Sequence, residues 1–176
     1  MGKQYTSLSK HDIHFIQNQK LFYIASASDH EVNLSPRGYD SLYIKDSNTL
    51  YMIDYLGSGN RTARDISNDG EVTLLFNAFE GKPKILRCFC KGESVLKEAQ
   101  SFKTLSTYFE ADMRAIRQIF IFNIYAVESS CGMGVPLMKF QKERQEVKEY
   151  ALDMSEKGLF DQYIQDHLIP PDLSKL

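Results

Sequence analysis

The spacing of apolar residues changes from helical to strand-like after about residue 20. Ser9 precedes apolar residues at Ile13 and Ile16, a spacing that predicts a short amphipathic helix over 10–19 with Ser9 as its N-cap. Segment 21–26 then combines aromatic and β-branched residues, which is typical of a strand. Similar patterns predict strands over 32–35, 42–44, 49–54, 72–76, 85–91 (continuing through 92–95) and 119–127.

The connections between these strands are short, which favours antiparallel pairing. One connection is an expected turn at residues 28–30, and Gly92 is expected to mark a bulge or a close approach of two segments. Helices are predicted over about 61–66, 98–110 and 142–156, followed by a short helical tail. These elements predict a mainly β (α+β) fold, with six or seven strands curled into a small barrel and helices at its periphery.

The composition is that of one globular domain. The chain has 176 residues, of which 43% are hydrophobic and 25% charged, so we expect a single domain over 1–176 with a helical extension over about 141–176. A net charge of −2 argues against nucleic-acid binding. No apolar run reaches the roughly 18 residues that span a membrane, and no signal-peptide pattern is present. We therefore expect a cytoplasmic protein that does not associate with membranes.

The segment from Gly57 to Arg64 contains the features of a phosphate site. Two glycines allow close backbone approach, a predicted helix begins directly after Asn60, and Arg61 and Arg64 add positive charge. The segment matches neither the nucleotide-triphosphate loop nor the dinucleotide-binding glycine pattern. A turn followed by a capped helix with solvated arginines explains the spacing equally well.

Two other segments could contact a ligand. The strand that runs into Ser35 and Pro36 ends with unpaired amides and a hydroxyl, which suit a flat heteroaromatic ring, although an edge strand closing in a proline turn has the same sequence. Strand alternation places Arg87 on the face opposite Cys88 and Cys90, where it is either solvated or in contact with a ligand.

The sequence offers no catalytic side-chain constellation. Three cysteines leave an odd number and predict no disulfide, and Cys88 and Cys90 are expected to be buried thiols. His11 and His14 are spaced for a shared helix face but have no third ligand in sight, so we expect no metal site.

The order of these motifs resembles that of the pyridoxamine 5′-phosphate oxidase-like family of FMN-binding split β-barrel proteins. The resemblance covers about residues 10–140 and is carried by LFYIASAS, VNLSPRG, TLYMIDYLGSGNRTARDISNDGEVTLLF and PKILRCFCKGESV. The tail ESSCGMGVP, followed by a charged helix, is similar to one subgroup of uncharacterised flavoproteins. The resemblance implies an antiparallel split β-barrel of Greek-key type, and a homodimer with FMN at the subunit interface.

The resemblance also implies which residues bind FMN. Those expected around the isoalloxazine ring are Asn33, Leu34, Ser35, Ile53, Asp54 and Arg87, the last in place of a glutamine that faces the flavin in the family. Asn60, Arg61 and Thr62 match the family's serine-arginine-lysine phosphate motif. Thr62 stands where the oxidases have lysine, so either Arg64 or Arg37 would supply the missing charge.

Three functions are consistent with the sequence. The first is an FMN-dependent oxidoreductase that uses NAD(P)H or a small reduced substrate, in which the cofactor does the chemistry. The second is a non-catalytic module that binds a flavin, haem or deazaflavin, or senses redox state. The third, a nucleic-acid-binding barrel, is disfavoured by the charge. The chain has no Trp and ends in IPPDLSKL, unlike the segment that closes over pyridoxal phosphate in the true oxidases, which argues against vitamin B6 oxidation.

Overall fold

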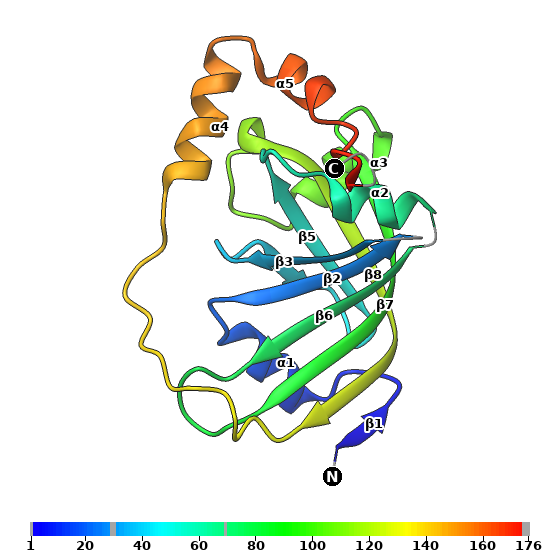
Figure 1. Ribbon diagram of the computed structural model, residues 1–176, viewed down its shortest axis with the longest axis vertical. Helices are drawn as coiled ribbons and strands as arrows, with labels where there is room; N and C mark the ends of the chain where they lie inside the picture. Colours follow the sequence, from blue (N-terminus) through cyan, green and yellow to red (C-terminus); the bar gives the residue numbers. More distant parts are fainter. Residues whose placement is uncertain (1, 29–30, 69, 174–176) are drawn as a thin grey trace.

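The computed structural model describes residues 2–28, 31–68 and 70–173, and most of them belong to one antiparallel sheet (Figure 1). The strands are β1 (Lys3–Tyr5), β2 (Phe22–Ser28), β3 (Glu31–Arg37), β4 (Leu42–Ile44), β5 (Thr49–Tyr55), β6 (Glu71–Asn77), β7 (Ile85–Leu96) and β8 (Ile116–Ser130). The helices are α1 (Lys10–Gln17), α2 (Arg61–Asn68), α3 (Gln100–Ser106), the 3-10 turn η1 (Met113–Ala115), α4 (Glu146–Glu156) and α5 (Phe160–Asp166). Two residues of the expected turn at 28–30 lie outside the described residues.

The sheet order is β3-β2-β6-β7-β8-β5-β4, with β1 added alongside β8, and every pair is antiparallel. The two ends of this path, β3 and β4, do not pair with one another in the described residues, so the sheet curves without closing. This confirms the predicted α+β split barrel. The sheet has eight strands rather than six or seven, because Lys3–Tyr5 pairs with the end of β8 and is too short to show a period in the sequence.

The core lies inside the curved sheet. Strands β2, β5, β6, β7 and β8 contribute its largest fully buried side chains, which include Phe76, Phe120, Phe122, Ile24, Leu50, Met52, Leu74 and Leu86. Most of the large apolar side chains of segments 72–76 and 119–127 are buried within this one chain. The edge strand β3 also carries exposed apolar side chains, with Val32 85% and Leu34 64% exposed.

Two local predictions, the Ser9 cap and the role of Gly92, are confirmed by the structure. Ser9 caps α1 as expected: its hydroxyl accepts from the Asp12 amide at 3.2 Å, and the Asp12 carboxylate accepts from the Ser9 amide at 3.0 Å. Gly92 is a close-approach point, because a Cβ there would lie 2.9 Å from two side-chain atoms of Ile66 on α2. The missing side chain therefore lets α2 pack directly on β7. The irregularity in the β7 pairing lies between Phe89 and Cys90 instead.

The C-terminal extension folds back over one end of the sheet (Figure 1). Residues 131–145 run without helix or strand, and α4 and α5 then cover the region around β5 and η1. Ala151 of α4 and Phe160 of α5 are buried against Leu56 and Ala115. The extension therefore shares a small apolar cluster with the barrel. Within the described ranges, no helix is long and apolar enough to cross a bilayer.

Candidate functional site

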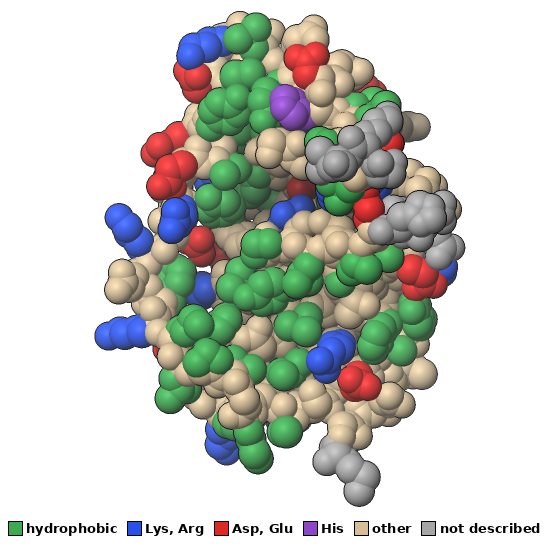
Figure 2. All heavy atoms as spheres, in the orientation of Figure 1, with side chains coloured by type: hydrophobic (Ala, Val, Ile, Leu, Met, Phe, Trp, Pro, Cys, Tyr) green, Lys and Arg blue, Asp and Glu red, His purple; other side chains and the backbone are tan. Residues whose placement is uncertain are grey.

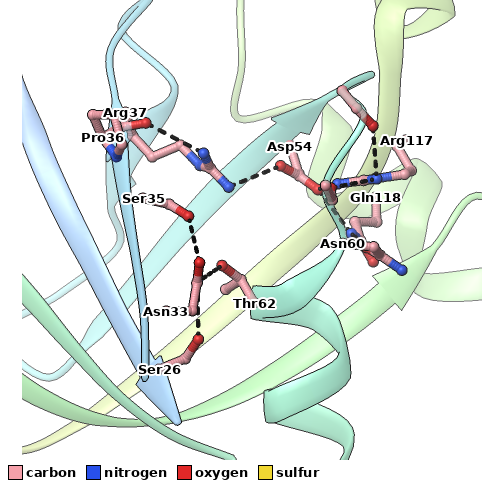
Figure 3. A network of polar contacts seen from close by, with 12 residues as sticks. Ser26, Asn33, Ser35, Pro36, Arg37, Asp54, Asn60, Thr62, Arg117 and Gln118 are labelled. Carbon is pink, nitrogen blue, oxygen red and sulfur yellow. Dashed lines mark hydrogen bonds and ion pairs between the residues drawn. The ribbon is translucent and has the colours of Figure 1, made fainter. Parts of the chain in front are cut away.

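A cavity of about 350 Å³ opens where the ends of β3 and β5 meet the start of α2. The loop from Leu56 to Asn60 forms one wall, and Val147 of α4 reaches it from the extension. Figure 3 shows polar side chains from these elements pointing toward one another. Figure 2 shows charged side chains around a hollow between the helical extension and the sheet.

Most of the residues expected to bind a ligand come together here. Seven of them line the cavity: Asn33, Ser35, Ile53, Asp54, Asn60, Arg61 and Thr62. They come from three segments that are separate in the sequence, namely β3, the end of β5 and the start of α2. The two candidate motifs of the sequence therefore line one cavity.

Leu34 and Arg87 do not line this cavity. Leu34 lies between Asn33 and Ser35, and strand alternation turns its side chain to the opposite face of β3. Arg87 lies on β7, where its Nη1 contacts Glu128 Oε1 at 3.3 Å and Ser130 Oγ at 3.4 Å. Its neighbours Leu86 and Cys88 are fully buried on the other face, as the alternation predicted.

A hydrogen-bond network joins β3 to α2 (Figure 3). The Asn33 side-chain amide donates to Ser26 Oγ and to Thr62 Oγ1, each at 3.1 Å, and Ser35 Oγ donates to Asn33 Oδ1 at 3.1 Å. Ser26 in turn donates to Asp65 Oδ2 at 2.6 Å. Asn33 thereby fixes the start of α2 against the sheet and presents the Ser35 and Thr62 hydroxyls at the cavity.

A buried ion pair supports the floor of the cavity. Asp54 and Arg117 are 4% and 7% exposed, and Arg117 donates to Asp54 Oδ2 through Nη2 at 2.6 Å and Nε at 3.1 Å. Gln118 Nε2 donates to the same oxygen at 2.8 Å. Arg117 Nη1 also donates to the Gly59 carbonyl at 3.0 Å. One guanidinium therefore holds both the end of β5 and the glycine loop before α2.

The donors at the start of α2 are already paired with oxygens of the chain. The Glu31 carboxylate, at the start of β3, accepts from Arg61 and from Arg64, the latter at 2.8 Å. Asn60 Nδ2 donates to the Leu168 carbonyl at 2.9 Å, while Asn60 Oδ1 accepts from Gln118. The bond from Arg64 and the charge of Arg61 hold the pKa of Glu31 below its ordinary value, so this carboxylate is ionised at neutral pH.

Two buried polar atoms at the cavity are left unpaired in the described part of the chain, Arg37 Nε and Ser41 Oγ. Ser41 is only 2% exposed. Arg37 Nη2 lies 3.7 Å from Asp54 Oδ1, so its charge is directed into the site. Since buried donors without partners are costly, these atoms are suited to a bound ligand with acceptor oxygens or nitrogens.

Four contributors to this region were not anticipated from the sequence: Glu31, Ser41, Arg117 and the Leu168 carbonyl. Arg117 had a usable signal: it precedes the apolar run of β8 and has a potential carboxylate partner, Asp54, in a strand that was also predicted to be buried. Glu31 had no such signal, because an acidic residue beside a turn is ordinary in a loop.

The cysteines and histidines form no reactive cluster in the residues that the structure covers. All three cysteines are free, Cys88 and Cys90 are buried, and Cys131 is exposed, which confirms the expectation of no disulfide. Burial raises the pKa of Cys88 to about 12 and raises that of Cys90 as well, so both thiols stay protonated. No group of potential metal ligands occurs among these residues.

The geometry defines a split-barrel protein with a polar cavity beside a helix start. A family model described as pyridoxamine 5′-phosphate oxidase matches residues 10–131. That match covers more than half of the chain, and the chain belongs to this family.

One relative bears the same family name, and two solved structures share the fold. The chain is 28% identical over 166 residues to the pyridoxamine 5′-phosphate oxidase family protein ustO of Aspergillus flavus, covering 90% of this chain and 67% of that protein. The fold is similar to that of a histidine-to-alanine variant of HupZ from Group A Streptococcus, with a TM-score of 0.58 and 15% identity over 69% of this chain and 98% of that one. It is also similar to an FMN-binding protein from Syntrophomonas wolfei, with a TM-score of 0.50 and 14% identity over 71% and 83% of the two chains.

Proposed function

We propose that this chain is an FMN-binding flavoprotein and that the cavity between β3, β5 and α2 is its cofactor site. The observation that carries the proposal is the meeting of the two candidate motifs at one cavity, with arginines at a helix start on one side and a polar strand end on the other. Family membership supports it, and the similar fold from Syntrophomonas wolfei is titled an FMN-binding protein.

The residues present fit a phosphorylated flavin. Arg61, Thr62 and the free amides of the first turn of α2 would hold the phosphate. The polar edge of the ring would lie against Ser35 of β3, where the unpaired atoms of Arg37 and Ser41 offer donors to its carbonyl oxygens. Leu34 faces away from this cavity and is 64% exposed, so it would not touch a ring bound there.

We further propose that two copies of the chain form a homodimer. The exposed face of the sheet carries apolar side chains over β3, β2 and β6 in Figure 2, including Val32 and Leu34. A contiguous apolar surface of this kind is typical of an interface. Arg87 does not line the cavity of its own chain, so it would contact the flavin bound by the other copy, across this interface.

We propose an oxidoreductase role, in which the flavin supplies electron transfer and the chain supplies binding and orientation. A second cavity of about 450 Å³ supports this, because it shares Tyr39, Ile53 and Tyr55 with the first and could admit a small reduced substrate. The alternative is a non-catalytic flavin-binding or redox-sensing module. Anaerobic mixing of the FMN-loaded protein with NADH or NADPH separates the two: bleaching of the flavin absorbance supports the oxidoreductase, and its persistence favours the module.

The binding site itself is tested with an Arg61→Ala variant. The loss of a charge-assisted contact to phosphate should weaken FMN binding by roughly ten- to a hundredfold. Riboflavin has no phosphate, so its affinity should stay the same. Arg87→Ala should instead alter the spectrum or reduction potential of the bound flavin.

Fluorescence titration of the apo-protein with both flavins measures these effects, with Arg114→Ala, a surface arginine outside the cavity, as the control. Equal weakening of FMN and riboflavin by Arg61→Ala contradicts the phosphate assignment. A wild-type chain that binds neither flavin contradicts the proposed function.

A further inference from the structure

Glu31 borders the proposed flavin site without lining its cavity, and its carboxylate pairs with Arg61, which does line it. Its carboxylate accepts bonds from Arg61 and Arg64, the two arginines in the first turn of α2. Arg64 is additionally held by Asp65, with Nη2 2.7 Å from Oδ1. The Glu31 and Arg61 side chains are 14% and 23% exposed, so the pair is only partly screened by water.

Residues 168–171, called here the C-terminal segment, contact the same region at the start of α2. The Pro171 carbonyl accepts from Arg61 Nη2 at 3.0 Å, and the Leu168 carbonyl accepts from Asn60 Nδ2 at 2.9 Å. The segment is held over the site by α5, whose Phe160 is buried against Leu56 and Ala115. Two of the side chains expected to meet a phosphate, Asn60 and Arg61, are thus paired with oxygens of the protein itself.

We infer that Glu31 is a specificity-determining residue: its carboxylate is an internal substitute for the phosphate of the ligand, and a phosphorylated flavin must displace both it and the C-terminal segment. The inference rests on the proposed function. A flavin without a phosphate does not need to contact Arg61, so the bonds of Arg61 to Glu31 and to the C-terminal segment remain. Glu31 therefore lowers the affinity for FMN and reduces the preference of the site for FMN over riboflavin.

A purely structural role for Glu31 predicts the opposite result. If its carboxylate served to hold Arg61 and Arg64 in position for a phosphate, its loss would weaken FMN binding. If it contacted the ribityl chain, its loss would weaken FMN and riboflavin alike. The sign of the change and the comparison of the two flavins therefore separate the three roles.

The test is a Glu31→Gln variant of the full chain, titrated with FMN and with riboflavin. The amide keeps the shape of the side chain but removes the charge that competes with phosphate. We expect FMN to bind roughly five- to thirtyfold more tightly and riboflavin to change by less than about twofold. Glu71→Gln is the control, because Glu71 also begins a strand and pairs with a lysine, Lys91 at 2.6 Å, outside the cavity.

The displacement of the C-terminal segment has its own measurement. The amides of His167 and Leu168 are protected by bonds to the Tyr163 and Gln165 carbonyls. Hydrogen exchange at these amides should speed up when FMN binds to the wild type and should not change with riboflavin. Unchanged exchange with bound FMN would overturn the displacement of the segment. Unchanged or weaker FMN binding in Glu31→Gln would overturn the role of Glu31.

Failure of the proposed function gives a different pattern. If neither flavin binds any variant, flavin binding is refuted, and a titration with inorganic phosphate followed through the amide signals of α2 tests Glu31 alone. Tighter phosphate binding in Glu31→Gln than in wild type and in Glu71→Gln supports the internal substitute. Equal binding in all three overturns it.

Discussion

Replacing Arg117 with methionine should destabilise the protein strongly, because Asp54 would remain as a buried carboxylate without its main partner. Arg117 gives Asp54 two bonds to one oxygen and also holds the glycine loop through the Gly59 carbonyl. Methionine fills a similar volume but donates no bond to Asp54 or to the Gly59 carbonyl. Breaking a buried ion pair from one side costs about 3–5 kcal/mol.

The structure places the expected cost toward the lower end of that range. Asp54 keeps a bond of 2.8 Å from Gln118 and an ion pair of 3.7 Å with Arg37, which offset part of the loss. We therefore expect the free energy of unfolding to fall by about 3 kcal/mol. With a urea m value of about 2 kcal/mol/M, the midpoint should fall by about 1.5 M, as followed by far-UV circular dichroism.

Two further variants make this reasoning refutable. The double variant Asp54→Asn with Arg117→Met removes the orphaned charge and should recover about half of the lost stability. Arg114→Met breaks an arginine–aspartate pair at the surface, where Arg114 is 58% exposed, and should cost about 0–1 kcal/mol. Two results would refute the assignment of this cost to a buried charge. One is a double variant that is no more stable than Arg117→Met, and the other is a loss of stability in Arg114→Met as large as that in Arg117→Met.

Three other predictions concern the thiols, the α1 cap and the oligomeric state. Under native conditions a thiol reagent should modify Cys131 quickly and the buried Cys88 and Cys90 slowly, with three thiols found after denaturation; two missing thiols would contradict the absence of a disulfide. Burial acts to raise the pKa of Asp12, but bonds from Lys84 and the capping serine outweigh it and hold the pKa below its ordinary value. The contribution of Asp12 to the free energy of unfolding is therefore present at neutral pH and is lost as the pH falls through that lowered pKa. Asp12→Asn should cost about 1–2 kcal/mol in urea unfolding at pH 7, and this cost should shrink steadily as the pH is lowered through the acidic range; a cost that stays the same would refute this origin. Light scattering at micromolar concentration should give twice the chain mass of 20.2 kDa, and a monomer would exclude the proposed dimer.

The sequence by itself determined the secondary structure well, because the patterns involved are local. Aromatic and β-branched residues marked β2 and β5, alternation marked β7, and the hydroxyl of Ser9 located the start of α1. The two candidate ligand segments were also visible, since glycines before a helix and a strand ending at Ser-Pro are local features. The resemblance to the family joined them into one site, and the structure shows that they do meet at one cavity.

Contacts between distant segments were decided only by the tertiary structure. Asp54 and Arg117 are 63 residues apart, and Asn60 meets the carbonyl of Leu168 over 108 residues. Glu31 gave no sign of its role, because a carboxylate beside a turn looks the same whether it faces water or two arginines. Which of these partners meet depends on how the sheet curves and where the extension packs. Periodicity reports which face of an element is buried, but the partner across that face is selected by the packing of the whole chain.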